Sequence, residues 1–131
     1  MAKPRTENEI AREVVDACYE IHTTLGPGLL ESVYERVLAH ELRSRGLVIQ
    51  NQVPIDIVYR DLNLAGAFAA DIIVDNKVIV ELKSVERVAP VHAKQLLTYL
   101  RLSDMRLGLL VNFGEAYIKN GIKRVINGTL D

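Results

Sequence analysis

Asp71, Glu81 and Lys83 are the residues whose types and spacing point most clearly to chemistry. Apolar residues recurring with a period of two predict strands over residues 68–74 and 77–85, and these two strands carry all three side chains. Glu81 and Lys83 are two residues apart, so their side chains point to the same face of their strand. Charged residues among apolar neighbours are costly unless they are paired or bind a metal ion.

The loop between the two strands decides whether the carboxylates meet. If it has three residues, 75–77, then Val74 pairs with Val78 and Asp71 lies directly opposite Glu81. A loop of two residues would place Asp71 on the other face of the sheet, because side chains alternate along a strand. We expect the three-residue loop, since it brings the charges together.

Such a group could activate water. Asp71 and Glu81 could bind Mg²⁺ or Mn²⁺ through their carboxylate oxygens, and the backbone carbonyl of Leu82 could be a further ligand. A bound divalent ion lowers the pKa of its water, and Lys83 could position that water, help to deprotonate it and neutralise developing charge. An ion pair that only supports the sheet is the alternative, and spacing alone does not separate the two interpretations.

The surrounding elements must position this hairpin. Thr6 and Glu9 form a capping-box pattern, Gly46 stands where a left-handed residue would end a helix, and Pro90 suits the first position of another. The predicted helices cover residues 6–25 and 29–45, and a third helix begins at residue 90. The predicted strands cover residues 47–52, 55–59, 68–74, 77–85, 107–111 and 122–126, with a turn region at 60–65.

The second helix is expected to bury Leu30, Val33, Tyr34, Val37, Leu38 and Leu42. The order α, α, β, β, β, β, α, β, β predicts an α/β protein, with a central mixed sheet flanked by helices.

Length and composition fit one domain over residues 1–131. Lys and Arg number 16 and Asp and Glu 17, so the formal net charge of −1 gives no general attraction to polyanions. Cys18 is the single cysteine, which excludes an intrachain disulfide, and we expect it in the core. No apolar run is long enough to span a membrane and no signal-peptide pattern is present, so we expect a cytoplasmic protein with no membrane partner.

Two sets of motifs resemble known families. Asp71 followed by Glu81-Leu82-Lys83 across a hairpin resembles the signature of the PD-(D/E)XK nuclease superfamily, with Ala70 in the place of the proline. Upstream, Gly28-x-x-Glu31-x-x-Tyr34 resembles the motif that names the GxxExxY family. Similar segments follow in the same order at residues 50–52, 91–100, 108–114 and 121–125, so that the resemblance covers about residues 10–127.

The resemblance implies a restriction-endonuclease-like core and further site residues. In related nucleases a helical glutamate completes the metal site directly or through water, and Glu31 would take that role here; an acidic residue favoured by the helix dipole is the alternative. Gln95 and Tyr99 resemble the Gln-x-x-x-Tyr element of RecB-like nucleases, which borders the active site and contacts substrate or supports the lysine. A polar residue at a helix edge and a half-buried tyrosine are the alternative.

The sequence therefore predicts a nuclease that depends on Mg²⁺ or Mn²⁺ and hydrolyses phosphodiester bonds of nucleic acid, with DNA favoured. Its catalytic residues would be Asp71, Glu81, Lys83 and Gln95, and Tyr99 would bind substrate. The alternative is a catalytically silent nuclease-fold module for binding or assembly, or a subunit that needs a partner. The sequence leaves open whether two copies pair as a homodimer.

Overall fold

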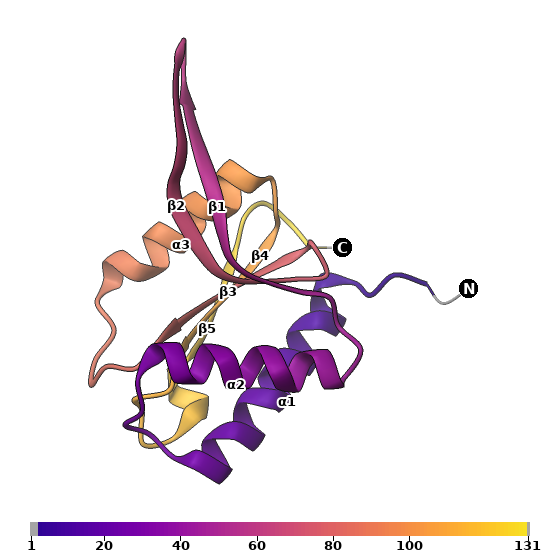
Figure 1. Cartoon of the computed structure of the whole chain (residues 1–131), viewed down its shortest axis with the longest axis vertical. Helices are drawn as coiled ribbons and strands as arrows, with labels where there is room; N and C mark the ends of the chain where they lie inside the picture. The colour runs from indigo at the N-terminus through magenta and orange to yellow at the C-terminus, as the bar shows by residue number, and fades with distance from the viewer. Residues whose placement is uncertain (1–2, 131) are drawn as a thin grey trace.

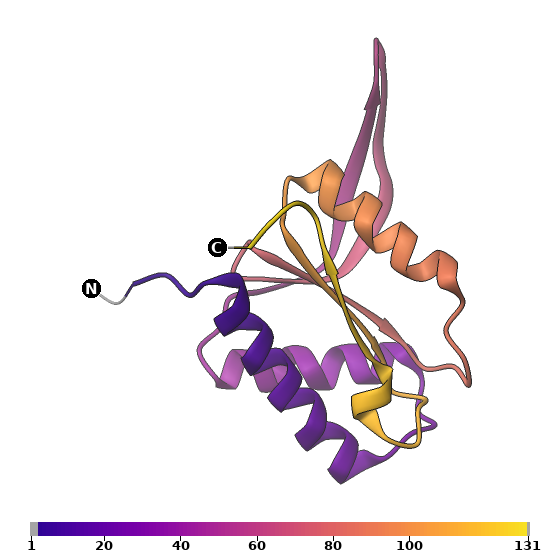
Figure 2. The same ribbon diagram turned by 180° about the vertical axis from the view of Figure 1, so that it is seen from behind.

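The chain forms one mixed five-stranded sheet with helices on both faces. The structure is a computed structural model that describes residues 3–130. Its elements are α1 (Glu7–Leu25), α2 (Glu31–Ser44), β1 (Ile49–Tyr59), β2 (Leu62–Val74), β3 (Val78–Lys83), α3 (Pro90–Ser103), β4 (Leu107–Asn112), the 3₁₀ helix η1 (Ile118–Gly121) and β5 (Ile122–Ile126). The strand order is β1-β2-β3-β4-β5, and only β3 and β4 run parallel. Figures 1 and 2 show α1 and α2 on one face of the sheet and α3 on the other, which confirms the predicted fold class.

The helix ends follow the local sequence signals. The side chain of Thr6 accepts a hydrogen bond from the Glu9 backbone N–H at 3.2 Å, and the Glu9 carboxylate accepts one from the Thr6 N–H at 2.9 Å. Gly46 has a φ of 86° just after α2, as its position predicted. Pro90 is the first residue of α3. Within residues 3–130, no helix is both long enough and apolar enough to cross a bilayer.

Two apolar cores hold the layers together. Beneath α1 and α2, Tyr34 and Phe113 are fully buried and stack with ring centroids 4.3 Å apart. Cys18 lies in the same core, where burial raises the pKa of its thiol to about 12 and makes it a small apolar side chain rather than a nucleophile. On the other face, Leu96 and Leu100 of α3 pack on the sheet.

The predicted buried face of α2 was wrong at its start. Leu30 is 72% exposed and Val33 is 38% exposed. The helix begins only at Glu31, so Leu30 precedes it, and the stripe that reaches the core runs through Tyr34, Leu38 and Leu42. Val37, also expected there, is only half-buried.

Among the described residues, three strands precede α3, whereas the sequence predicted four. Residues 47–52 and 55–59 were expected as separate strands with a turn over 60–65, yet β1 runs continuously to Tyr59 and β2 begins at Leu62. Asp56 explains part of this continuity, because its carboxylate accepts a hydrogen bond from the Gly66 backbone N–H at 2.7 Å across the two strands. The result is a long hairpin arm, residues 56–67, that projects beyond the sheet (Figure 1).

Arg45 ties α1 to α2. Its guanidinium contacts the carboxylates of Glu13, Asp16 and Glu20 on α1 and of Glu41 on α2, at 2.7 to 3.3 Å. The four carboxylates come from successive turns of one helix and from the turn before Arg45 on the other. This single side chain therefore links the two helices at the surface.

Gly108 of β4 lets α3 approach the sheet, and replacing it should destabilise the protein. A Cβ at Gly108 would lie 2.8 Å from Cγ of Leu96, so we expect Gly108→Ala to lower the free energy of unfolding by about 1–3 kcal/mol. Urea denaturation measures this change. In a Leu96→Ala background the same substitution should cost much less, and an equal cost in both backgrounds would show that this contact is not the cause.

Candidate active site

The turn between β2 and β3 sets the register of the site. Residues 75–77 form the turn, Val74 pairs with Val78, and Ile72 pairs with Val80. This is the three-residue loop that the sequence predicted. Continued by one residue along each strand, the same register places Asp71 opposite Glu81.

Hydrogen bonds cross between the two acidic residues. The Asp71 carboxylate accepts a bond from the backbone N–H of Leu82 at 2.8 Å, and the Glu81 carboxylate accepts one from the backbone N–H of Asp71 at 3.3 Å. Each carboxylate is therefore held against the opposite strand. Glu81 is only 9% exposed, so the pair is closed off from most of the solvent.

This burial perturbs the Glu81 carboxyl strongly. Desolvation raises the pKa of Glu81 to about 9, and the charge of Asp71 together with a hydrogen bond between the two side chains adds to the rise. The bond from the Asp71 backbone N–H and the charge of Lys83 act in the opposite direction but do not offset it. The site therefore holds a proton at neutral pH unless another positive charge takes its place.

The acidic pair faces α3. Ile79, two residues before Glu81 on β3, packs in the core under α3. Side chains two residues apart on a strand point to the same face, so Glu81 and Lys83 also point towards α3. Tyr99 of α3 packs against the core on this same face. Burial first, and then the charges of Glu81 and Asp71, raise the pKa of its hydroxyl. Its ring also packs on Phe68, with centroids 5.0 Å apart.

Gln95 and Glu31 are both exposed. Gln95 lies on α3, one turn before Tyr99. Glu31 is the first residue of α2 and lines a groove with Ser84 and Gly114 at the end of β3. Among residues 3–130, no three His, Cys, Asp or Glu side chains are grouped so that they could share one metal ion. The structure thus pairs Asp71 with Glu81 and leaves Glu31 outside the carboxylate pair.

The carbonyl of Leu82 lies on the acidic side of β3. The N–H of Leu82 bonds to Asp71 on the β2 side, whereas the carbonyl of Lys83 accepts from the Phe113 N–H on the β4 side. Because the N–H and C=O groups of one strand residue point to the same neighbour, the Leu82 carbonyl is directed towards the β2 side. Its direction is compatible with the ligand role predicted for it.

Three residues for which the sequence predicted no role complete the surroundings. The Gln52 side-chain amide donates to Asp71 at 3.2 Å and to Glu35 at 2.7 Å, and Asn51 donates to the second oxygen of Glu35 at 3.2 Å. Gln52 has a φ of 48°, which turns it out of the regular β1 ladder at the point opposite Asp71. The polar run at 50–52 was the available signal, but this local departure from the ladder is a tertiary feature.

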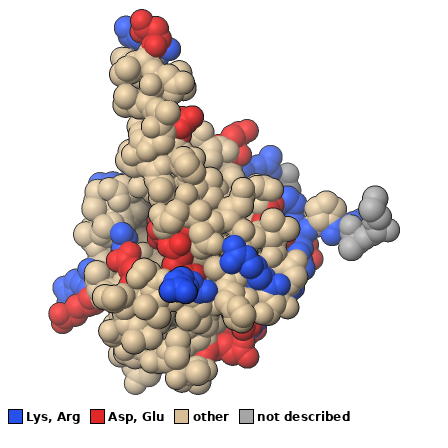
Figure 3. Space-filling view, in the orientation of Figure 1, with Lys and Arg blue, Asp and Glu red and all other residues tan. Residues whose placement is uncertain are grey.

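The surface around this site carries charges of both signs. Figure 3 shows acidic side chains at the foot of the hairpin arm with basic side chains beside them, whereas the shaft of the arm is uncharged up to its tip. A uniformly basic face, as expected for tight nonspecific binding of nucleic acid, is not present in this view.

A mixed sheet with helices on both faces, and an acidic pair followed by lysine at its centre, define a nuclease-type domain. The family model of the PD-(D/E)XK nuclease superfamily matches residues 8–125, and the chain belongs to that superfamily. No curated protein and no solved structure matches the chain. Membership indicates hydrolysis of nucleic acid and a divalent metal ion as the typical cofactor.

The raised pKa of Glu81 predicts how stability depends on pH. Between its ordinary value of 4.5 and about 9, the folded protein keeps the Glu81 proton while the unfolded chain has lost it. The stabilisation is therefore complete below pH 4.5 and is lost as the pH rises through about 9. We expect Glu81→Gln to exceed the wild type in free energy of unfolding by an amount that grows from pH 5 to pH 9.

Urea denaturation in a chelating buffer at several pH values measures this difference. Exposed Glu86 provides the matched control, and Glu86→Gln should track the wild type throughout. Parallel curves for Glu81→Gln and the wild type would contradict the perturbed carboxyl.

Proposed function

We propose that this protein is a Mg²⁺-dependent nuclease that hydrolyses phosphodiester bonds of nucleic acid, with DNA as the favoured substrate. The observation that carries the proposal is the pair of buried Glu81 and half-buried Asp71, joined by crossed hydrogen bonds, with Lys83 on the same face of β3. An ion pair that only supports the sheet would not need two carboxylates to share one buried position. Their repulsion and desolvation are costs that a divalent cation removes.

The donor atoms suit magnesium or manganese. Mg²⁺ commonly binds through one or two carboxylates and completes its shell with water and substrate phosphate oxygens. Asp71 and Glu81 would supply the carboxylates, and the Leu82 carbonyl would supply a further oxygen. Glu31 would then act through a water molecule.

Lys83, Gln52 and the backbone of Leu82 would have separate roles in the reaction. When bound, the metal ion supplies an activated water and stabilises charge on the phosphate. Lys83 orients the attacking water, helps to remove its proton and stabilises the negative charge that develops. Gln52 holds one oxygen of Asp71, and the Leu82 N–H holds the other, so the carboxylate keeps a fixed orientation.

Residues of α3 would border the substrate. Tyr99 packs on the same face of the sheet as the acidic pair and would contact a phosphate or support Lys83. Gln95 is exposed one turn away, where its amide could reach a substrate that covers the site. Both roles stay predictions.

The finer assignments made from the sequence also belong to this proposal. We infer that the chain is a GxxExxY-type member of the superfamily and that residues 1–131 act as one nuclease-like domain. Cytoplasmic localisation and pairing as a homodimer stay predictions.

A catalytically silent module for binding or assembly is the second candidate. The formal net charge of −1 and the position of Glu31 outside the acidic pair favour it. Metal binding separates it from the nuclease, because a silent module has no need to retain a divalent ion.

Removing Lys83 should abolish most of the cleavage. We expect Lys83→Ala to cut plasmid or single-stranded DNA with Mg²⁺ or Mn²⁺ at least about a hundredfold more slowly than the wild type, since it removes a group that stabilises the transition state. Gel assays of both purified proteins measure the rate. Arg12→Ala, on α1, is the control and should cleave normally; equal background rates for wild type and Lys83→Ala would refute the catalytic role.

Removing one carboxylate should remove the metal. Calorimetric titration with Mn²⁺ should show binding at millimolar or lower concentration for the wild type and none for Asp71→Asn. Asp56→Asn makes the same change in charge on the hairpin arm and should bind as the wild type does. A wild type that binds no Mn²⁺ at millimolar concentration and elutes as a stable oligomer would favour the silent module.

A further inference from the structure

A cavity of about 320 Å³ lies on the same face of the sheet as the acidic pair. It opens between the first turn of α3 and strands β4 and β5. The charged residues that line it are Arg87, Lys123 and Glu115, and Val88, Ala93 and Leu110 are among its apolar residues. Its volume falls at the lower end of the range of small-ligand sites.

The cavity continues directly from the site. Leu110 of β4 pairs with Glu81 on one side and with Lys123 on the other, so the three residues form one row across β3, β4 and β5. Neighbouring strands are about 4.8 Å apart, which places Lys123 roughly 10 Å from Glu81 along this row. One row further, Asn112 of the cavity pairs with Lys83.

The walls of the cavity differ in character. Val88, Ala93 and Leu110 belong to the apolar core under α3 and form an apolar wall. Arg87 and Lys123 are exposed at its rim, and neither forms a salt bridge within residues 3–130. Glu115 is the one carboxylate that the described residues contribute to the lining, so the two cations outnumber it. An apolar wall with an excess of positive charge beside it matches a ligand that carries a flat, weakly polar ring and a phosphate.

We propose that this cavity binds an unpaired nucleotide of the substrate next to the scissile phosphate. Its base and sugar would lie on the apolar wall, and Lys123 and Arg87 would contact its phosphate. A base cannot enter such a cavity while it is stacked and paired in a duplex. The cavity therefore selects single-stranded nucleic acid or unpaired ends. This inference rests on the proposed nuclease function, which by itself specifies neither the strandedness nor the subsite.

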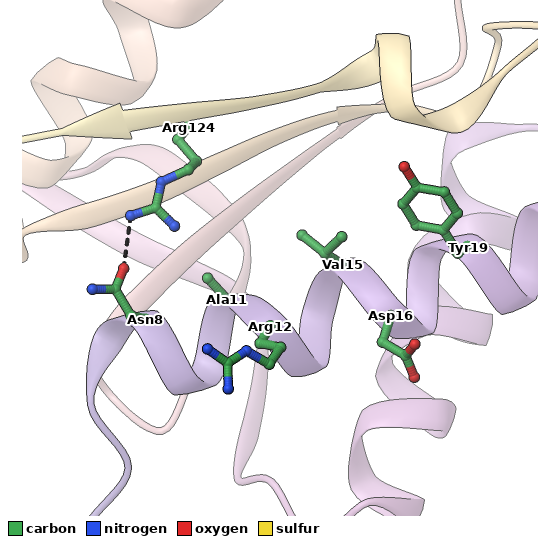
Figure 4. A pocket seen from close by; sticks show the side chains of 7 residues that line it. All are labelled: Asn8, Ala11, Arg12, Val15, Asp16, Tyr19 and Arg124. Carbon is green, nitrogen blue, oxygen red and sulfur yellow. Dashed lines mark hydrogen bonds between the residues drawn. The ribbon is translucent and has the colours of Figure 1, made fainter.

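The groove on the opposite face provides the contrast. It has about 610 Å³ and lies between α1 and β5, and Figure 4 shows Arg124 reaching from β5 towards Asn8, to which it donates a hydrogen bond at 2.7 Å. Arg124 follows Lys123 directly in the sequence, but the two side chains point to opposite faces of β5. Arg124 thus carries the same charge at the same strand without access to the cavity.

The test compares Lys123→Ala with Arg124→Ala in binding, so that it does not depend on cleavage. A fluorescent single-stranded oligonucleotide and its duplex are titrated in the Lys83→Ala background, and anisotropy is measured at several salt concentrations. Each phosphate contact on a single strand contributes about 0.7 to the slope of log affinity against log salt. Lys123→Ala should lower the slope by about 0.7 and weaken binding about fivefold at 0.1 M salt, whereas Arg124→Ala should leave both unchanged.

Ala93→Leu fills the cavity without changing charge and should remove the preference for the single strand over the duplex. Equal losses from Lys123→Ala and Arg124→Ala, or tighter binding of the duplex by the unfilled protein, would overturn the cavity assignment. If Lys83-dependent cleavage occurs while Lys123→Ala binds the single strand normally, the nuclease function is supported and nucleotide binding in the cavity is refuted. If no cleavage occurs but binding of the single strand depends on Lys123, nucleotide binding in the cavity is supported and the nuclease function is refuted.

Discussion

The register between β2 and β3 is the constraint on which the site depends. Asp75 and Asn76 adopt left-handed conformations in the turn, and Asp75 is anchored by a hydrogen bond from the Val48 N–H to its carboxylate. If β2 shifted by one residue, Asp71 would point into the apolar core beneath α1 and α2. Ile72, which now lies in that core, would point towards α3 instead. The two cores therefore select the register that also joins the carboxylates, so folding and site formation share one cause.

The acidic pair carries an electrostatic cost that the fold tolerates. Two backbone N–H groups and the Gln52 amide each donate to one carboxylate, which offsets part of the desolvation. The rest appears as the raised pKa of Glu81, so a proton or a cation must accompany the pair. Strongly perturbed carboxyl groups of this kind are typical of functional sites.

The central sheet separates two surfaces with different chemistry. The α3 face holds the acidic pair and Tyr99, and the row from Glu81 through Leu110 to Lys123 connects the pair with the cavity. The α1 and α2 face holds the larger apolar core and the Arg45 network. Alternation along each strand makes this separation possible, because adjacent residues such as Lys123 and Arg124 serve different faces. Function on one face can thus vary without disturbing the packing on the other.

Periodicity and local signals in the sequence were sufficient for the helices, which depend on contacts between residues close in the chain. The hairpin register was assumed because it brings Asp71 opposite Glu81, and the structure has that register. Only the tertiary structure decided that Gln52 leaves the β1 ladder and donates to Asp71, that Glu35 accepts from Gln52 and that Glu31 lies outside the pair. Those positions depend on how α2 packs beside the edge strand β1, and packing between distant segments is set by the whole core rather than by any local pattern.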